Sequence, residues 1–367
     1  MLIGLPKEIK NHEYRVGMIP NHVRALTGRG HEVWVQRGAG AGSGFDDESY
    51  AAAGARLVDS AAEVWTNAAM IVKVKEPVAS EYDLMQEGQL IYTYLHLAAD
   101  PTLTEQLLKR RVSGVAYETI ELANGHLPLL APMSQVAGRM ATQVGAQYLQ
   151  REKGGKGVLL GGVPGVRKGR VVILGGGVVG AQAATIALGM GADVRILDVN
   201  AKRLEELDLL FEGRVQTLYS DPYTIAEQVR GADLVIGAVL IAGAKAPTLV
   251  SRKLIGEMEP GSVVVDVAVD QGGCIETCHA TTHDNPTFVV DGVIHYCVAN
   301  MPGAVSRTST LALNAVTRPY LLDLVDKGLE GACKADPALM LGLNTYAGRC
   351  THKAVAESLG YAYEPLV

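Results

Sequence analysis

The chain has 367 residues, 48% of them hydrophobic and 20% charged, with a formal net charge of −6. At about 100–200 residues per domain, this length predicts two domains, and the composition supplies enough apolar material for a core in each. An acidic chain without a basic tract argues against a nucleic-acid partner, and the lack of about 18 consecutive apolar residues argues against a membrane partner.

The first 130 residues are expected to form an α/β domain without a glycine fingerprint. Short β-rich runs alternate there with helical stretches. The expected strands are Leu2–Leu5, Glu32–Val35, Ile71–Val74, Leu90–Leu95 and Val112–Tyr117, and helices are expected near Pro20–Arg29 and Pro101–Arg110.

The segment Pro132–Tyr148 looks helical and is expected to link two domains as one side of a hinge, with Ser134 as its N-cap. A glycine-rich run over residues 154–165 follows. No Gly-Lys-Ser/Thr follows its glycines, so it is not a P-loop, and we predict a flexible hairpin or subunit contact without chemistry.

From residue 170 onward, nearly continuous apolar runs alternate with helical stretches, as is typical of parallel strands covered on both faces. The expected strands are Val171–Leu174, Val194–Leu197, Val215–Leu218, Leu234–Val239, Ser262–Val267 and Val293–Val298. Six such strands with intervening helices predict a doubly wound Rossmann domain.

The tail from about Ser306 is expected to be helical, with apolar residues at helical spacing over Leu311–Leu329, and to return to the first domain. The predicted fold class is therefore α/β with two doubly wound Rossmann-like domains. An NAD-binding domain, residues 131–305, is inserted in a discontinuous substrate domain made of residues 1–130 and 306–367.

A glycine fingerprint carries the strongest functional signal. Gly175-x-Gly177-x-x-Gly180 follows an apolar strand and precedes an Ala-rich helix. Gly175 permits the tight turn, Gly177 lets the backbone approach a pyrophosphate, and Gly180 allows close packing of helix on strand. The helix N-terminus then offers N–H groups to the phosphates, which predicts a dinucleotide site.

Asp198 at the end of the next strand indicates the kind of dinucleotide. It lies 23 residues past Gly175, close to the roughly 20 expected for a ribose-binding carboxylate. A carboxylate accepts hydrogen bonds from two ribose hydroxyls but repels a 2′-phosphate, so we predict NAD rather than NADP. Lys202 and Arg203 follow closely and weaken that preference slightly.

Four ionisable residues stand near strand ends, where ligands of open α/β sheets gather. They are Arg15, Lys75, His96 and Asp270. Each has a structural alternative: a solvated surface cation, a hydrogen-bonded histidine, or an aspartate that caps a turn. Together they suit oxidation of an amino acid at its α-carbon. Arg15 and Lys75 would bind the carboxylate, while His96 and Asp270 would move protons.

A group of cysteines and histidines late in the chain offers metal-ligating side chains. Its members are Cys274, Cys278, His279, His283, His295 and Cys297. Their spacing does not repeat as zinc ligands usually do, so we expect core cysteines beside surface histidines and no metal. Five cysteines, all late in the chain, and no apolar leader at the N-terminus favour a reduced, cytoplasmic location.

Several segments resemble the alanine dehydrogenase / transhydrogenase alpha-subunit family, and alanine dehydrogenase within it. They are residues 6–20, 74–77, 92–98 and 131–141, the GGGVVG fingerprint, residues 265–274 and residues 298–310. The resemblance runs from residue 1 to past 320, and these segments stand in the expected order and spacing. The resemblance implies reversible, NAD-dependent oxidative deamination of L-alanine to pyruvate and ammonia.

The resemblance also implies roles for individual residues. Arg15 and Lys75 would hold the carboxylate and carbonyl oxygen of the substrate, and His96 and Asp270 would be the acid–base pair. The NAD site would include Ser134, Asp198, Arg203, Ser220, Val239, Leu240, Val298, Asn300 and Met301, besides the three fingerprint glycines. Members of the family are typically homohexamers, so an oligomer of that size is implied.

Two other functions remain open from the sequence. One is the soluble NAD-binding subunit of a proton-translocating transhydrogenase, in which the counterparts of His96 and Asp270 are replaced. This chain keeps both residues, which favours a dehydrogenase. The other is an NAD sensor without catalysis, which intact acid–base candidates disfavour.

Overall fold

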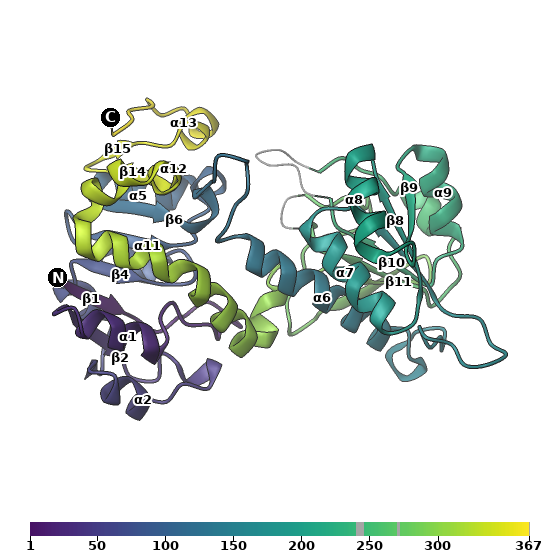
Figure 1. The fold of residues 1–367 in the computed structure, drawn as a ribbon, viewed down its shortest axis with the longest axis horizontal. Helices are drawn as coiled ribbons and strands as arrows, with labels where there is room; N and C mark the ends of the chain where they lie inside the picture. Colours follow the sequence, from purple (N-terminus) through teal and green to yellow (C-terminus); the bar gives the residue numbers. More distant parts are fainter. Residues whose placement is uncertain (240–245, 270–271, 367) are drawn as a thin grey trace. The chain divides into compact units, whose positions relative to one another are not determined.

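The computed structural model describes residues 1–239, 246–269 and 272–366 (Figure 1). The chain divides into two compact units: unit 1 comprises Met1–Met133 and Gly303–Val367, and unit 2 comprises Ser134–Pro302. Helix α6 (Ala131–Tyr148) contains the first boundary. Both units are α/β and Rossmann-like, which confirms the predicted fold class.

Unit 1 is built on a mixed sheet in the order β15-β14-β6-β5-β4-β1-β2-β3. The six strands from β6 to β3 are parallel, whereas β14 pairs antiparallel with both β6 and β15. The strands are β1 (Leu2–Leu5), β2 (Glu32–Gln36), β3 (Arg56–Val58), β4 (Met70–Val72), β5 (Leu90–Thr93), β6 (Ser113–Ala116), β14 (Leu343–Tyr346) and β15 (Arg349–Cys350).

Helices cover both faces of this sheet because its central strands are apolar on both sides. Ile71 and Ile91 pack in a core with residues of α3, α5 and α13. Tyr92, on the other face, donates its hydroxyl proton to Thr317 O of α11 at 3.1 Å. The helices are α1 (Pro20–Thr27), α2 (Asp47–Ala52), α3 (Ala61–Asn67), α4 (Ala79–Tyr82), α5 (Pro101–Lys109), α11 (Ser306–Ala335), α12 (Pro337–Gly342) and α13 (Lys353–Leu359).

In the described part of unit 2 the sheet order is β12-β13-β11-β10-β7-β8-β9. All neighbours are parallel except β12, which pairs antiparallel with β13. The strands are β7 (Arg170–Leu174), β8 (Asp193–Asp198), β9 (Gln216–Tyr219), β10 (Leu234–Gly237), β11 (Val263–Asp266), β12 (Thr287–Val290) and β13 (Val293–Tyr296).

Both faces of this second sheet are also covered. Val172 and Val235 pack with residues of α9 and α10. On the opposite face, α6 approaches so closely that a Cβ on Gly145 would lie 2.5 Å from the Leu234 side chain. The helices of unit 2, besides α6, are α7 (Val178–Gly189), α8 (Ala201–Phe211), α9 (Pro222–Arg230) and α10 (Arg252–Ile255).

Several details differ from the sequence predictions. Ser134 is not an N-cap, because α6 already begins at Ala131. The tail is not wholly helical: α11 has non-helical backbone angles at Gly328, and β14 and β15 follow it. The predictions also lack strands β3 and β12. Among the described residues, no helix combines the length and hydropathy needed to cross a membrane.

Candidate functional site

The glycine fingerprint of unit 2 forms the tight turn between β7 and α7. Gly175 has φ +102°, and a Cβ there would lie 2.7 Å from Ala238 O. A Cβ on Gly180 would lie 1.9 Å from Gly175 O, so only glycine lets α7 pack this closely on the turn. At Gly177 a Cβ would meet no atom within 4 Å, which leaves open space on that side of the turn.

The N-terminus of α7 differs from those of its neighbours. Gly177 is the N-cap of α7 and supplies no side-chain hydrogen bond. By contrast, Asn200, Asp221 and Ser251 cap α8, α9 and α10 through side-chain oxygens. An uncapped helix start beside open space fits the pyrophosphate of a dinucleotide, whose oxygens would accept from the N–H groups of the first turn.

Asp198 is the last residue of β8, next to β7 in the sheet. Its carboxylate accepts from Gly176 N at 2.7 Å and from Asn200 N at 2.8 Å, so the backbone holds it against the glycine turn. Arg203, in the first turn of α8, donates from Nε to Gly176 O at 2.7 Å. An acceptor carboxylate at this strand end suits the hydroxyls of an adenine ribose.

Other residues predicted for the NAD site follow the carboxyl ends of parallel strands in unit 2. Ser220 follows β9 and donates its backbone N–H to Asp198 O at 3.0 Å. Val239 follows β10 and is half-buried. The remaining members are the buried Val298 and the half-buried Asn300 after β13, Met301 at the start of a 3₁₀ turn, and Ser134 within α6; Leu240 lies outside the described residues.

The substrate candidates of unit 1 also follow strand ends. Arg15 follows β1, Lys75 follows β4 and His96 follows β5. The strand order reverses between β1 and β4, and a reversal of this kind is where open α/β sheets bind ligands. The structure therefore brings these three residues to the same edge of one sheet.

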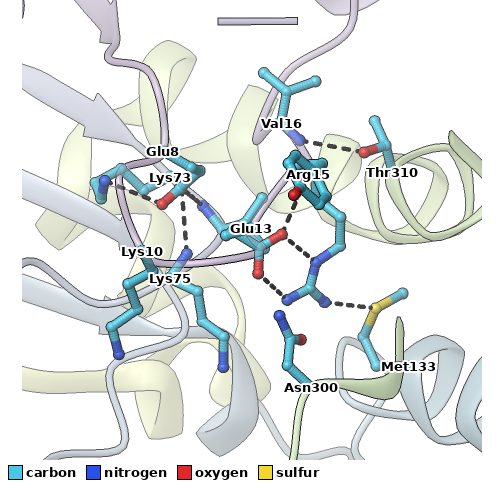
Figure 2. Close-up of polar contacts among 12 residues, drawn as sticks. Glu8, Lys10, Glu13, Arg15, Val16, Lys73, Lys75, Met133, Asn300 and Thr310 are labelled. Atoms are coloured by element: carbon cyan, nitrogen blue, oxygen red, sulfur yellow. Dashed lines mark hydrogen bonds and ion pairs between the residues drawn. The ribbon is translucent and has the colours of Figure 1, made fainter. Parts of the chain in front are cut away.

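Arg15 is buried and held by an acidic neighbour (Figure 2). Its Nε and Nη2 atoms donate to the two oxygens of Glu13 at 2.7 and 2.5 Å, and Nη1 donates to Met133 Sδ at 3.1 Å. Burial raises the pKa of Glu13, but the Arg15 guanidinium outweighs burial and the pKa lies below its ordinary value. Glu13 thus fixes the direction of the guanidinium and takes its Nε–Nη2 edge.

The tail of the chain supports the segment that carries Arg15. Val16 N donates to Thr310 Oγ1 at 3.1 Å (Figure 2). Ile19 N donates to Asn314 Oδ1 at 2.9 Å. Asn314 Nδ2 in turn donates to Val16 O at 3.0 Å. Helix α11 therefore anchors the loop after β1, which explains why residues far apart in the sequence form one unit.

Lys75 is positioned through its backbone by a buried ion-pair network. Glu8 accepts from Val74 N at 2.6 Å and from Lys75 N at 3.3 Å (Figure 2). The buried Lys73 ammonium lies 3.1 Å from Glu8 Oε2 and 3.0 Å from Glu81 Oε1. Glu8 therefore tethers the backbone after β4 to the loop after β1 and is itself held by Lys73.

His96 stands at a strained position on the rim of the same edge. Its φ of 51° is in the left-handed region, which is rare for a residue with a side chain. Glu118 stabilises this bend, because its carboxylate accepts from His96 N at 2.6 Å and from Leu95 N at 3.2 Å. The imidazole is 45% exposed and stacks on the Tyr94 ring, so it is accessible for proton transfer.

Asp270 lies outside the described residues, and its predicted role stays a prediction. The loop that leads to it is organised by the buried Asp266, the last residue of β11. The Asp266 carboxylate accepts from Ala268 N and Cys274 N, each at 3.0 Å.

The cysteine and histidine residues considered as metal ligands have other interactions. The Nε2 atom of His295 is hydrogen-bonded to Thr277 Oγ1 at 2.7 Å, and its Nδ1 atom is hydrogen-bonded to Val293 O at 3.0 Å. Burial raises the pKa of the Cys274 thiol, which disfavours the thiolate that metals prefer. In the part of the chain that the structure describes, no three metal-ligating side chains lie together.

Comparison with known proteins identifies the family. The model described as "Alanine dehydrogenase/PNT, N-terminal domain" matches residues 4–137, and the corresponding "C-terminal domain" model matches residues 141–353. The chain belongs to the alanine dehydrogenase/PNT family.

Relatives named alanine dehydrogenase are similar along their whole length. The chain is 57% identical over 366 residues to "Alanine dehydrogenase" of Methanococcus maripaludis, and the match covers 100% of this chain and 98% of the relative. It is also 57% identical to "Alanine dehydrogenase" of Staphylococcus haemolyticus, with 99% of this chain and 97% of the relative covered.

Solved structures of the alanine dehydrogenase/PNT family support the same assignment. One described as "L-alanine dehydrogenase" has a TM-score of 0.95 and 55% identity, covering 98% of this chain and 99% of its own. The transhydrogenase from Sinorhizobium meliloti has a TM-score of 0.83 and 27% identity, covering 96% and 100% respectively. Within the family, this chain is therefore more similar to the dehydrogenases than to that transhydrogenase.

The sequence analysis missed the acidic partners of the site in this family member. Glu8, Glu13 and Glu118 each accept hydrogen bonds that orient a candidate residue or its backbone. Glu8 and Glu13 lie in the same segment as Arg15. A buried guanidinium needs a hydrogen-bond acceptor, so Glu13, two residues from Arg15, could have been predicted as its partner. Glu8 and Glu118 could not, because their partners Val74 and His96 are distant from them in the sequence.

Proposed function

We propose that this chain is an NAD-dependent alanine dehydrogenase. It interconverts L-alanine, NAD⁺ and water with pyruvate, ammonium, NADH and a proton. The observation that carries the proposal is similarity at 55–57% identity over nearly the full length to proteins named alanine dehydrogenase. The cations at the edge of the unit 1 sheet and the dinucleotide turn of unit 2 agree with this chemistry.

NAD is the cofactor that the described residues of unit 2 fit. The uncapped start of α7 would bind the pyrophosphate, and the Asp198 carboxylate would accept hydrogen bonds from ribose hydroxyls and repel a 2′-phosphate. Bound NADH would supply the hydride that reduces the C2 carbon in the aminating direction. The Arg203 side chain, held to Gly176 O, would support the same turn.

Substrate binding is assigned to Arg15 and Lys75. Arg15, fixed by Glu13, would donate to the carboxylate of pyruvate or alanine. Lys75 would place its ammonium at the carbonyl oxygen, where positive charge stabilises the charge that develops as ammonia adds to C2. Fixing two charged points on a small molecule also aligns it, which accounts for part of the rate enhancement.

His96 and Asp270 are assigned to proton transfer. The accessible imidazole of His96 would accept a proton from the attacking nitrogen and donate one to the carbinolamine hydroxyl, which leaves as water, a type of assistance worth about 10²–10⁴ in rate. Asp270 would orient the ammonium or the carbinolamine.

The proposal extends to location and assembly. All five cysteines are free in the structure, which suits a reducing, cytoplasmic setting. By the family resemblance, we propose a homohexamer. Light scattering coupled to size-exclusion chromatography would test this, and a monomer at micromolar concentration would contradict it.

A steady-state assay tests the proposed reaction. Purified protein is expected to oxidise NADH when pyruvate and ammonium are both present, and not when either is omitted. The alternative, a transhydrogenase subunit, would transfer hydride between nucleotides without a requirement for ammonium. A well-folded protein without pyruvate- and ammonium-dependent turnover would exclude the proposal.

A further inference from the structure

The loops after β1 and β4 are joined by an ion pair beside Lys75. Lys10, in the first loop, pairs through Nζ with Oε1 of Glu76, in the second. Strands β1 and β4 are adjacent and parallel, so this ion pair bridges the point at which the strand order reverses. Figure 2 shows the Lys10 and Lys75 side chains running in the same direction.

Glu76 has a cation partner, Lys10, whereas the neighbouring Lys75 ammonium has no acidic partner among the described residues. Among residues 1–239, 246–269 and 272–366, the Lys75 ammonium has no hydrogen bond or ion pair. Within the same residues, Glu76 Oε2 is buried without a hydrogen-bond partner. A buried carboxylate oxygen without a donor is unfavourable, so Glu76 has a strong tendency to attract a cation.

The charge of Glu76 acts on the Lys75 ammonium, as the pKa of Lys75 indicates. Burial lowers the pKa of Lys75 below its ordinary value, and the charge of Glu76 opposes this effect most strongly. Arg15 and Lys10 lower the same pKa, while Glu13 raises it. Lys75 and Glu76 therefore interact without forming an ion pair, while Glu76 pairs with Lys10.

We propose that Lys10 is a positioning residue that sequesters Glu76 and so keeps the Lys75 ammonium available for the carbonyl oxygen of the substrate. The inference rests on the proposed function for its kinetic consequence but not for its structural one. Burial raises the pKa of Glu76, while the charges of Lys75 and Lys10 outweigh burial and lower it, so Lys75 is the cation left to Glu76 once Lys10 is removed. A Lys75 held by Glu76 would point its hydrogen-bond donors away from the substrate.

Kinetics of Lys10→Met provide the first test. Loss of one charged hydrogen bond to the substrate is expected to raise the KM for pyruvate about tenfold or more, with the KM for NADH unchanged. Lys10→Met/Glu76→Gln is expected to return the KM for pyruvate to near the wild-type value, because a neutral amide at position 76 does not capture the ammonium. The matched control is Lys7→Met, which removes an exposed lysine from the same loop and is expected to behave as wild type.

The outcomes separate sequestration from a direct role of Lys10. If the double variant stays as impaired as Lys10→Met, Lys10 acts through its own charge and the proposal is wrong. An unchanged KM in Lys10→Met also overturns it. Rescue in the double variant supports it when the structure of Lys10→Met also shows Lys75 held by Glu76, because Glu76→Gln would by itself relieve an unpaired buried carboxylate.

A crystal structure of Lys10→Met gives a readout that does not need activity. The expected result is a new ion pair between Lys75 Nζ and the Glu76 carboxylate, with nitrogen and oxygen within about 4 Å. A Lys75 ammonium that remains apart from Glu76 would overturn the inference even if the enzyme is active. Conversely, the new ion pair in a protein without turnover would uphold it while the proposed function fails.

Discussion

Replacement of Arg15 by Lys tests how the substrate carboxylate is bound. In the structure the guanidinium donates to Glu13 through Nε and Nη2 at 2.7 and 2.5 Å. A lysine ammonium keeps the charge but cannot contact both Glu13 oxygens and the substrate with a planar fork. Loss of one charge-assisted hydrogen bond costs about 1.5–3 kcal/mol, which corresponds to about 10–150-fold in affinity.

We therefore expect Arg15→Lys to raise the KM for pyruvate by about 10–150-fold and to leave the KM for NADH within about twofold of wild type. The assay is NADH oxidation at saturating ammonium with pyruvate varied. Arg29→Lys is the matched control, because within the described part of the chain Arg29 makes only exposed contacts, to Ala25 O and Asp326. An unchanged KM for pyruvate in folded Arg15→Lys would refute the assigned role.

Three further predictions concern catalysis, cofactor choice and stability. His96→Ala is expected to abolish turnover while NADH binding, followed by fluorescence, stays within about threefold of wild type; near-normal turnover would remove His96 from the mechanism. Asp198→Ala is expected to weaken NADH binding by about tenfold or more and to narrow the preference for NADH over NADPH, and a preserved preference would contradict its ribose-binding role. Asp233 is buried and its pKa is about 2, because Arg167 and Lys156 outweigh burial, so the ionised group adds about 2 kcal/mol of stability above pH 3.8. That contribution declines below about pH 4 and is lost as pH falls through about 2, so the difference between the urea midpoints of wild type and Asp233→Asn should narrow as pH is lowered from about 6 to about 3, and a pH-independent difference would contradict it.

The parallel strands were predictable because their burial on both faces leaves an apolar run in the sequence. All six runs predicted after residue 170 correspond to strands of the unit 2 sheet. The missed strands are short or lie at sheet edges, such as β15 with two residues and the antiparallel β12. A run of two to four residues gives too few positions for the periodicity of a strand to stand out from its surroundings.

The ends of helices α6 and α11 were predicted less well than the helices themselves. Ser134 was expected to cap α6, but Pro132 favours the first helical turn, and the helix begins before both residues. Ser134 therefore lies inside the helix. The helix after residue 306 was predicted, but Gly328, with φ 70°, interrupts it within the stretch Leu311–Leu329, where the apolar residues have helical spacing.

The candidate site could be predicted only in part. The fingerprint glycines and Asp198 are recognisable because a tight turn and a strand end impose local spacing. The acidic partners are not, since Glu8 contacts Val74 across 66 positions and Glu118 contacts His96 across 22. Such pairings depend on sheet order, which brings the loops after β1, β4, β5 and β6 to one edge and cannot be read from spacing.

The most direct test of the central claim is a substrate panel with both nicotinamide cofactors. Wild-type protein is assayed with pyruvate, glyoxylate and other small 2-oxo acids, each with ammonium and either NADH or NADPH. We predict the highest kcat/KM for pyruvate with NADH and a strict requirement for ammonium. Ammonium-independent hydride transfer between nucleotides, or no turnover with pyruvate by folded protein, would contradict the account.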